Sequence, residues 1–424
     1  MADVQPLRAL RYDARAVGGL EKVAAPPYDV IDETLRAELA ARSPFNVVEI
    51  DLPRSSEGGG DPYLHAQTLV EAWGQQGVLT RDREPALWPM TQEFTVPGGN
   101  SERLVRHGFF ARVRVEPYGQ GRIRPHERTQ PGPKEDRLRL TRATRANLSP
   151  IFSLFPDDAG AAWGALAPFT SDEPFATVTG TDGTLNRLWR VGDETALEAV
   201  GAALAHAELL IADGHHRYET SRLYADEVGG EGEHRYVLMY LCALSDPGLA
   251  VLPTHRLLTG LDEPKQLAIR DALLSRFDVE QVPSMDDVQP PAETPGVVLG
   301  YADSFHRQPY RLTLKDPDAV AAALPDRSDA YRRLDTAVLE ALVLRGALGM
   351  SEDDVAAKRG LDYTADLGAA AAAVENADAD AVFFMRATPL EQVREVAAAG
   401  ESMPPKSTFF HPKVPTGLLF NALD

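Results

Sequence analysis

The sequence predicts a mixed α+β protein, within the broad α/β class, built from more than one domain. Short apolar runs typical of buried strands alternate with longer helical patterns through nearly the whole chain. The chain has 424 residues, which is too long for one small core and indicates two or three domains. Apolar residues make up 44% and charged residues 25% of the sequence, as in ordinary globular proteins.

The expected elements follow from two periodicities. Apolar residues spaced three or four positions apart predict helices, and short apolar or alternating runs predict strands. In the first half, the helices expected on this basis cover residues 34–42, 62–76, 134–148 and 194–206. The expected strands cover residues 46–52, 86–96, 104–118, 151–155, 175–180, 185–191, 209–212, 235–244 and 250–252. Two hairpins are expected, because turn sequences at 97–100 and 181–183 separate neighbouring strands.

The second half of the chain has a different balance of elements, with fewer strands. Helices are expected over residues 264–277, 335–348, 366–376 and 390–399. Strands are expected over residues 296–301, 310–314 and 381–385. The stretch 283–295 is rich in proline and acidic residues, which predicts a loop.

The charge balance limits the classes of partner. The chain has 63 acidic residues against 43 Lys and Arg, a formal net charge of −20. DNA binding needs basic surface against the phosphates, so a DNA-binding function is not expected. Attachment to an anionic membrane is not expected either. A local basic pocket can still bind a small anion, because nearby groups set the field in a cleft.

Cysteine content and apolar runs bear on the compartment. Cys242 is the single cysteine, so no intramolecular disulfide can form, which fits a reducing cytoplasm. The first residues do not resemble a signal peptide, and no run of about eighteen apolar residues predicts a membrane-spanning helix. We therefore expect a cytoplasmic protein.

The most informative stretch is Asp213-Gly214-His215-His216-Arg217. It follows the apolar run 209–212 and precedes a helical pattern, which predicts a strand-to-helix turn at Asp213 and Gly214. Glycine allows close approach of a ligand, and the N–H groups of a helix start attract anions. With three cationic or donor side chains, the stretch suits phosphate. Two alternatives stay open, a helix capped by Asp213 with solvated histidines, and a metal site.

Glu127 and the helix after it form a second candidate region. Glu127 follows a predicted strand on a loop, where a carboxylate can accept a proton from a substrate hydroxyl. It can equally cap the next helix or form an ion pair. That helix is strongly basic, either as a solvated face or as the wall of an anion pocket. Its basic residues are Lys134, Arg137, Arg139, Arg142 and Arg145.

Two proline-rich segments complete the candidates. Lys406, Ser407 and Thr408 follow two prolines near the C-terminus, and lysine is a good point-charge partner for phosphate. An ordinary surface loop is the alternative. Tyr28 and Asp29 lie on a segment that prolines hold extended, where they can bind a small polar substrate.

The Asp213–Arg217 stretch resembles the second signature box of the ParB/sulfiredoxin superfamily, and Pro125-His126-Glu127 resembles its first box. Members of that superfamily bind nucleotide phosphates through the second box, and some are free-serine kinases. The chain as a whole resembles the DUF1015 family. The segments that carry this resemblance are 25–31, 125–127, 213–217, 253–258 and 403–408. Sulfiredoxin chemistry needs a cysteine where this chain has histidine, so that activity is not expected.

The resemblance implies a fold and a division of the chain. We expect a ParB/sulfiredoxin-like nucleotide-binding core at about 104–258, within an N-terminal half spanning 1–258. Residues 259–424 are then a C-terminal α/β domain that contributes to the site. The separation of Glu127 and Asp213 is longer than in the superfamily, which implies an insertion between the boxes.

The implied function is a small-molecule kinase that uses ATP or ADP with Mg²⁺ and acts on a free hydroxy amino acid such as L-serine. The expected catalytic residues are Glu127 as base, Asp213, also the Mg²⁺ ligand, and His215. The expected phosphate-binding residues are Gly214, His216, Arg217, Lys406, Ser407 and Thr408. The expected substrate-binding residues are Tyr28, Asp29, His126, His255 and Arg256.

Two other functions remain alternatives at this point. One is a metal-dependent phosphohydrolase that uses Asp213, His215, His126 and Glu127 as ligands or catalysts. The other is a nucleotide-binding regulator without catalysis. The role of His411, where the family often has tyrosine, stays open, although His411 and Lys413 extend the basic cluster around Lys406.

Overall fold

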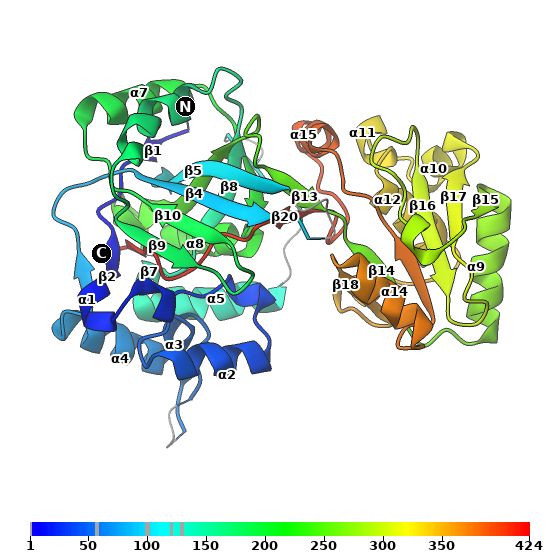
Figure 1. The fold of residues 1–424 in the computed structure, drawn as a ribbon, viewed down its shortest axis with the longest axis horizontal. Helices are drawn as coiled ribbons and strands as arrows, with labels where there is room; N and C mark the ends of the chain where they lie inside the picture. Colours follow the sequence, from blue (N-terminus) through cyan, green and yellow to red (C-terminus); the bar gives the residue numbers. More distant parts are fainter. Residues whose placement is uncertain (1, 56–58, 98–101, 119–121, 128–130) are drawn as a thin grey trace.

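The computed structural model describes residues 2–55, 59–97, 102–118, 122–127 and 131–424. Within these residues, the protein has one nine-stranded mixed sheet and one six-stranded antiparallel sheet. Each sheet forms a lobe with the helices that pack on it, and the two lobes lie side by side (Figure 1). No helix in the described part of the chain is long and apolar enough to cross a membrane.

The sheet of the first lobe mixes parallel and antiparallel pairs. Along its main path, the strands are β6 (Ile123–Arg124), β11 (Leu209–Asp213), β8 (Ile151–Phe155), β12 (Tyr236–Ala243), β5 (Arg103–Arg114), β4 (Trp88–Thr95), β10 (Leu185–Leu188) and β9 (Ala176–Thr179). A further strand, β1 (Val4–Gln5), pairs with β5. β8 runs parallel to β12 and β11 runs parallel to β6, whereas β11 and β8 are antiparallel.

Both faces of this sheet are buried, because alternate residues point to opposite sides. On β5, Phe110 belongs to one apolar cluster, while Phe109 and Ala111 belong to the other. The helices that contribute to the first cluster include α2 (Glu33–Arg42), α3 (Val48–Asp51), α4 (Pro62–Gln75) and α5 (Pro131–Thr144). Those that contribute to the second are α6 (Ala161–Leu166), α7 (Glu194–Leu204) and α8 (His215–Val228).

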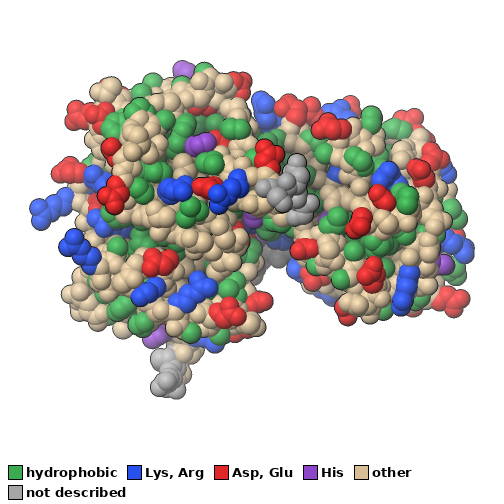
Figure 2. Space-filling model, in the orientation of Figure 1, with side chains coloured by type: hydrophobic (Ala, Val, Ile, Leu, Met, Phe, Trp, Pro, Cys, Tyr) green, Lys and Arg blue, Asp and Glu red, His purple; other side chains and the backbone are tan. Residues whose placement is uncertain are grey.

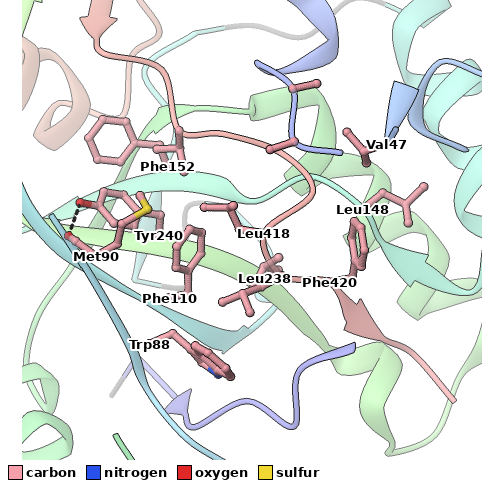
Figure 3. Close-up of a cluster of buried hydrophobic side chains, with 14 of the residues drawn as sticks. Val47, Trp88, Met90, Phe110, Leu148, Phe152, Leu238, Tyr240, Leu418 and Phe420 are labelled. Atoms are coloured by element: carbon pink, nitrogen blue, oxygen red, sulfur yellow. Dashed lines mark hydrogen bonds between the residues drawn. The ribbon is translucent and has the colours of Figure 1, made fainter. Parts of the chain in front are cut away.

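The end of the chain is part of the first cluster. Leu418 and Phe420 are buried with Phe110 and Tyr240, which come from the centre of the sheet (Figure 3). The hydroxyl of Tyr240 donates to the carbonyl oxygen of Met90 at 3.3 Å. The core of the first lobe is therefore complete only when the last residues of the chain return to it.

The second lobe is built on the antiparallel sheet. Its strands, in spatial order, are β15 (Phe277–Gln281), β17 (Tyr310–Leu314), β16 (Val298–Asp303), β19 (Ala381–Phe384), β14 (His255–Leu258) and β18 (Leu361–Thr364). Its apolar faces pack on helices, which include α9 (Glu263–Arg276), α12 (Asp335–Leu339) and α14 (Leu367–Glu375). The π-helix Glu340–Arg345 continues α12.

The expected mixture of helices and strands is confirmed, but three segments differ in type. Ala146–Asn147, expected at the end of a helix, is a strand, and Tyr28–Val30, expected to be extended, is a 3-10 helix. Residues 46–52 were expected as a strand, but Val48–Asp51 is the short helix α3. The side-chain oxygen of Asn46 accepts the N–H of Val48 at 3.1 Å, and its amide donates to the carbonyl oxygen of Lys22. This local bonding offers the backbone an alternative to a sheet. The turn expected at Gly98–Asn100 lies outside the described residues.

Two short strands join the lobes, one before and one after the second lobe in the sequence. β13 (Ala250–Leu252) precedes β14, and it pairs with β20 (Phe409–His411), which follows the second lobe. Further on, β21 (Asn421–Ala422) pairs with β7 (Ala146–Asn147). We therefore propose to place the division expected at residue 258 between β13 and β14, with the last residues of the chain assigned to the first lobe.

A buried arginine fixes the returning segment. Arg106 on β5 is fully buried, and its guanidinium donates to Gln92 Oε1 and to the carbonyl oxygens of His411 (3.4 Å) and Pro412 (2.6 Å). Gln92 donates in turn to the carbonyl oxygen of Lys413 at 3.2 Å. Among the described residues Arg106 has no carboxylate partner. Two side chains of the sheet therefore hold three successive carbonyl groups near the C-terminus.

We expect Arg106→Met to lower the free energy of unfolding by about 2–4 kcal/mol, because it leaves Gln92 Oε1 and buried carbonyl groups unpaired. Urea unfolding at pH 7 measures this loss. Arg103→Met on the same strand is the matched control, since the Arg103 side chain is 73% exposed. We expect the control to change stability by no more than about 0.5 kcal/mol. Equal effects of the two changes would contradict the structural role of Arg106.

Candidate active site

A cavity of about 1180 Å³ lies between the two lobes, beside the start of α8. The surface in Figure 2 is hollowed between the lobes, with acidic and basic side chains around the hollow. The predicted site residues that line the cavity are Tyr28, Asp29, Glu127, Asp213, Gly214, His215, His216, Arg217, Lys406 and Thr408. They come from both halves of the sequence, so the fold brings the two signature boxes and the Lys406 segment to one place.

The strand-to-helix turn forms as the sequence predicts. β11 ends at Asp213, Gly214 has a φ of 94°, and α8 begins at His215. A Cβ atom at Gly214 would lie 2.9 Å from Nε of Arg217, so both the backbone angle and the available space require glycine. Gly214 is the N-cap of α8 and makes no side-chain cap bond, so the alternative in which Asp213 caps the helix is not what the structure shows.

Asp213 forms two ion pairs instead. Its Oδ2 lies 2.6 Å from Nη2 of Arg217, and its Oδ1 lies 2.8 Å from Nζ of Lys413. Burial alone would raise the pKa of Asp213, but the charges of Lys413 and Arg217 outweigh burial and hold this pKa well below its usual range. Asp213 is therefore an anion that joins the turn to the C-terminal segment.

Arg217 keeps one donor without a partner. Its Nη1 donates to the carbonyl oxygen of Pro150 and its Nη2 to Asp213, but its buried Nε has no hydrogen-bond partner among the described residues. A buried unpaired N–H costs free energy unless a ligand or water satisfies it. Arg217 also lines the cavity, but its Nε is buried beside Gly214, so an anion would reach this donor only if the side chain shifted.

Two histidines connect the first box to the turn. His126 is fully buried, and its Nδ1 donates to the carbonyl oxygen of Ile211 at 2.6 Å. Burial lowers the pKa of His126, so the ring is neutral and its Nε2 accepts from the hydroxyl of Thr408 at 2.9 Å. The backbone N–H of His126 donates to Nε2 of His215 at 3.2 Å. His126 therefore positions His215 and Thr408, and it does not itself line the cavity.

The neighbouring Glu127 meets the Lys406 segment. Oε1 of Glu127 accepts the backbone N–H of Lys406 at 3.2 Å, and the carbonyl oxygen of His126 accepts the N–H of Met403 at 2.7 Å. Glu127 and Met403 also form a parallel β-bridge. Hydrogen bonds thus connect the first box to the Lys406 segment, although 279 positions separate Glu127 from Lys406.

Other predicted residues support this segment from outside the cavity lining. Ser407 is buried, and its hydroxyl donates to the carbonyl oxygen of Pro404 at 2.7 Å. Arg256 is buried, and its Nη2 donates to the carbonyl oxygen of Lys406 at 3.1 Å. His255 accepts the N–H of Met385 at 3.0 Å through Nδ1. These contacts give Ser407 and Arg256 the role of positioning Lys406.

Tyr28 and Asp29 lie at the edge of the cavity nearest α5. The Tyr28 ring centroid is 4.3 Å from the guanidinium carbon of Arg137 and 6.0 Å from that of Arg217. Burial raises the pKa of Tyr28 to about 12, so its hydroxyl remains protonated at neutral pH. Tyr28 can therefore donate a hydrogen bond to a ligand in the cavity.

The basic helix α5 carries a solvated face, because Arg139 and Arg142 are exposed, whereas Arg137 is buried. Most of its cations have acidic partners, and none of its described side chains lines the large cavity. The pairs are Lys134 with Glu219, Arg137 with Asp51, Arg139 with Asp61, and Arg142 with Glu227. Neighbouring carboxylates thus neutralise the local charge that the sequence suggested for an anion site.

Sequence reasoning gave no role to several charged residues of the cavity. Lys413, grouped only with the Lys406 cluster, is the second partner of Asp213. The second lobe adds a mixed set of charges, which includes Arg327, Glu340, Arg345 and Lys358. No local sequence signal marks these residues, because only the return of the chain and the packing of the two lobes bring them together.

The atoms proposed as metal ligands are already engaged. Both ring nitrogens of His126, Nε2 of His215 and both carboxylate oxygens of Asp213 have protein partners. In the described ranges, no group of three or more His, Cys, Asp or Glu side chains is arranged to hold a metal ion. The arrangement of these three residues therefore favours an anion site over a protein-held metal centre.

We expect Asp213→Asn to destabilise the protein by about 3–5 kcal/mol at pH 7, because two buried cations lose their partner. The folded-state pKa of Asp213 lies below the unfolded value of about 3.9, so the contribution of Asp213 is full above that pH and is lost as the pH falls further. Urea unfolding at pH 7 and pH 3 should therefore show a smaller difference at pH 3.

The matched control for this change is Asp226→Asn on helix α8, since Asp226 is 63% exposed in its pair with Arg235. We expect its effect to stay below about 1 kcal/mol at both pH values. If Asp213→Asn were as mild as the control at pH 7, the ion pairs of Asp213 would not stabilise the fold.

The chain is similar to several solved structures, all at low identity, and no curated protein matches it. A conserved hypothetical protein from Pyrococcus furiosus is 16% identical with a TM-score of 0.37, over 70% of this chain and 90% of that chain. A free serine kinase in complex with AMP is 14% identical with a TM-score of 0.35, over 68% and 83%. SbnI with a C-terminal truncation, from Staphylococcus aureus, is 9% identical with a TM-score of 0.36, over 73% and 86%.

A protein family covers most of the sequence. Its description is "Protein of unknown function (DUF1015)", and the match spans residues 4–337. This range contains both signature boxes and the whole of β14. The chain therefore belongs to the DUF1015 family.

Proposed function

We propose that the protein is a nucleotide-dependent kinase that transfers phosphate to the hydroxyl group of a small molecule. A free hydroxy amino acid such as L-serine is the leading acceptor, because the signature boxes resemble those of free-serine kinases. The observation that carries the proposal is the gathering in one cavity of the start of α8, the side chains of Arg217 and Lys406, and the carboxylate of Glu127. Phosphoryl transfer requires positive charge around the phosphates and a group that positions the nucleophile.

The cavity fits the phosphates of ATP or ADP. The residues that would hold them are Gly214, His216, Arg217, Lys406 and Thr408, with the N–H groups at the start of α8. The guanidinium of Arg217 lines the cavity and supports this assignment, since phosphate oxygens are strong acceptors for guanidinium donors. When bound, the nucleotide supplies the phosphoryl group.

Asp213 is the candidate ligand for Mg²⁺. Its two oxygens accept from Arg217 and Lys413, so a magnesium ion at this carboxylate would have to displace one of these cations. A magnesium ion is typically held by one or two protein carboxylates, and the substrate phosphates supply further oxygen ligands. Asp213 also keeps Arg217 in place, so it has a positioning role whether or not it binds the ion.

Glu127 is the proposed general base. Its Oε1 accepts the backbone N–H of Lys406, which fixes the carboxylate in the cavity wall close to a predicted phosphate ligand. From that position it would accept the proton of the substrate hydroxyl as the hydroxyl oxygen bonds to phosphorus. His215 is neutral because burial lowers its pKa. It would form a hydrogen bond with a phosphate oxygen of the nucleotide.

We expect Glu127→Gln to bind nucleotide almost as the wild type does and to lose phosphate transfer by about a hundredfold or more, the usual scale for a general base. Glutamine keeps the size of the side chain and an oxygen that can accept from Lys406, so only the base is removed. Nucleotide binding by calorimetry and transfer to L-serine should be measured on the same preparation.

Glu208→Gln serves as the matched control, because Glu208 is 52% exposed in its pair with Arg124 and does not line the cavity. Its transfer rate should match that of the wild type. Unchanged transfer in Glu127→Gln would remove Glu127 from the mechanism. Nucleotide binding without any transfer in the wild type, whatever the hydroxy amino acid offered, would favour the regulatory alternative.

A further inference from the structure

A second cavity, of about 360 Å³, lies next to the first, and we propose that it binds the base of the nucleotide. This inference rests on the proposed function, which assigns residues to the phosphates of the nucleotide but none to its base. The second cavity is formed by the segment around Pro26, the β9–β10 hairpin, β20 and the start of α14. It is thus a separate space with walls from both lobes.

The two cavities share part of their walls. Val30, Phe409 and Lys413 line both of them. Nζ of Lys413 lies 2.8 Å from Asp213 and 4.4 Å from the centroid of the Phe409 ring. A nucleotide whose phosphates lie at the start of α8 can therefore place its base in the second cavity by passing these three side chains.

The chemistry of the second cavity suits a nucleotide base. Most of its lining surface is apolar, with walls that include Ala24, Pro26, Leu35, Val178, Leu252 and Phe409. A flat, uncharged ring loses little solvation on entering such a space. Polar and charged residues also line the cavity, including Glu21, Arg42, Asp182 and Asp366, and these can pair with the polar edge atoms of the ring.

His411 supplies a polar group for the edge of such a ring. It is only 8% exposed, it lines the second cavity, and its ring packs against Phe94 with centroids 5.3 Å apart. Among the described residues, the imidazole has no hydrogen-bond partner. Burial lowers the pKa of His411, so the neutral ring offers one donor and one acceptor. A base edge carries complementary donors and acceptors.

The test compares ATP with inorganic tripolyphosphate, which has the phosphates but no base. In calorimetric titrations the wild type should bind ATP at least about tenfold more tightly than tripolyphosphate, which corresponds to about 1.4 kcal/mol from the base and sugar. Val30→Trp should obstruct the passage between the cavities. We expect it to weaken ATP binding by about tenfold and to leave tripolyphosphate binding within about twofold.

Val279→Trp is the matched control, because Val30 and Val279 are both 39% exposed and Val279 lies on β15, away from both cavities. It should bind both ligands as the wild type does. His411→Phe is a second variant that keeps an aromatic ring beside Phe94 and removes the hydrogen bonds. It should weaken ATP binding and leave tripolyphosphate binding unchanged.

The outcomes separate this inference from the proposed function. If ATP binds tightly to the wild type and equally well to Val30→Trp and His411→Phe, the base does not occupy the second cavity, and the kinase proposal stands. If tripolyphosphate binds as tightly as ATP to the wild type, the base has no site of its own and the inference fails. If neither ligand binds, the proposed function fails and the inference fails with it.

Discussion

The ion pairs of Asp213 are the constraint on which the rest of the site depends. This one carboxylate holds Arg217 from the helix that follows it and Lys413 from the far end of the chain. All three side chains are largely buried, so each needs the others to compensate for the loss of solvation. The strand-to-helix turn and the C-terminal segment are therefore energetically coupled, and the anion site at the start of α8 is complete only after the whole chain has folded.

This coupling explains why a second lobe can be inserted into the chain without separating the parts of the site. The second lobe leaves the first after β13 and returns through β20, which pairs with β13. Arg106 and Gln92 then hold the carbonyl groups that follow β20, which fixes the backbone at Lys413. On the other side, Arg256 holds the carbonyl oxygen of Lys406. Hydrogen bonds to the backbone thus position Lys413 from the first lobe and Lys406 from the second.

The sequence predicted what depends on local pattern. The apolar run before Asp213, the glycine after it and the helix that follows have local causes, and the turn forms as expected. Residues 46–52 have the apolar content of a strand, but the side chain of Asn46 hydrogen-bonds to the backbone of Lys22 and Val48, and a short helix forms instead. Lys413 as a partner of Asp213, and the positioning of Thr408 by the buried His126, depend on contacts between residues far apart in sequence. No local pattern predicts such contacts. The α5 cations do not form the wall of the large cavity, and the α8 carboxylates that pair with Lys134 and Arg142 could not be identified from a local pattern.

The same geometry accounts for an anion site in a strongly acidic protein. The net charge of −20 is a property of the whole chain, and salt screens interactions between exposed charges beyond about 8 Å. Inside the cavity, the distances are shorter and the surroundings less polar, so individual groups decide the potential. Asp213 is neutralised by two cations at 2.6 and 2.8 Å, which leaves one positive charge in excess among these three groups. Lys406 and Glu127 balance each other in charge, and the N–H groups at the start of α8 add to the excess at the turn. A phosphate would therefore be attracted to the turn although the protein as a whole repels it.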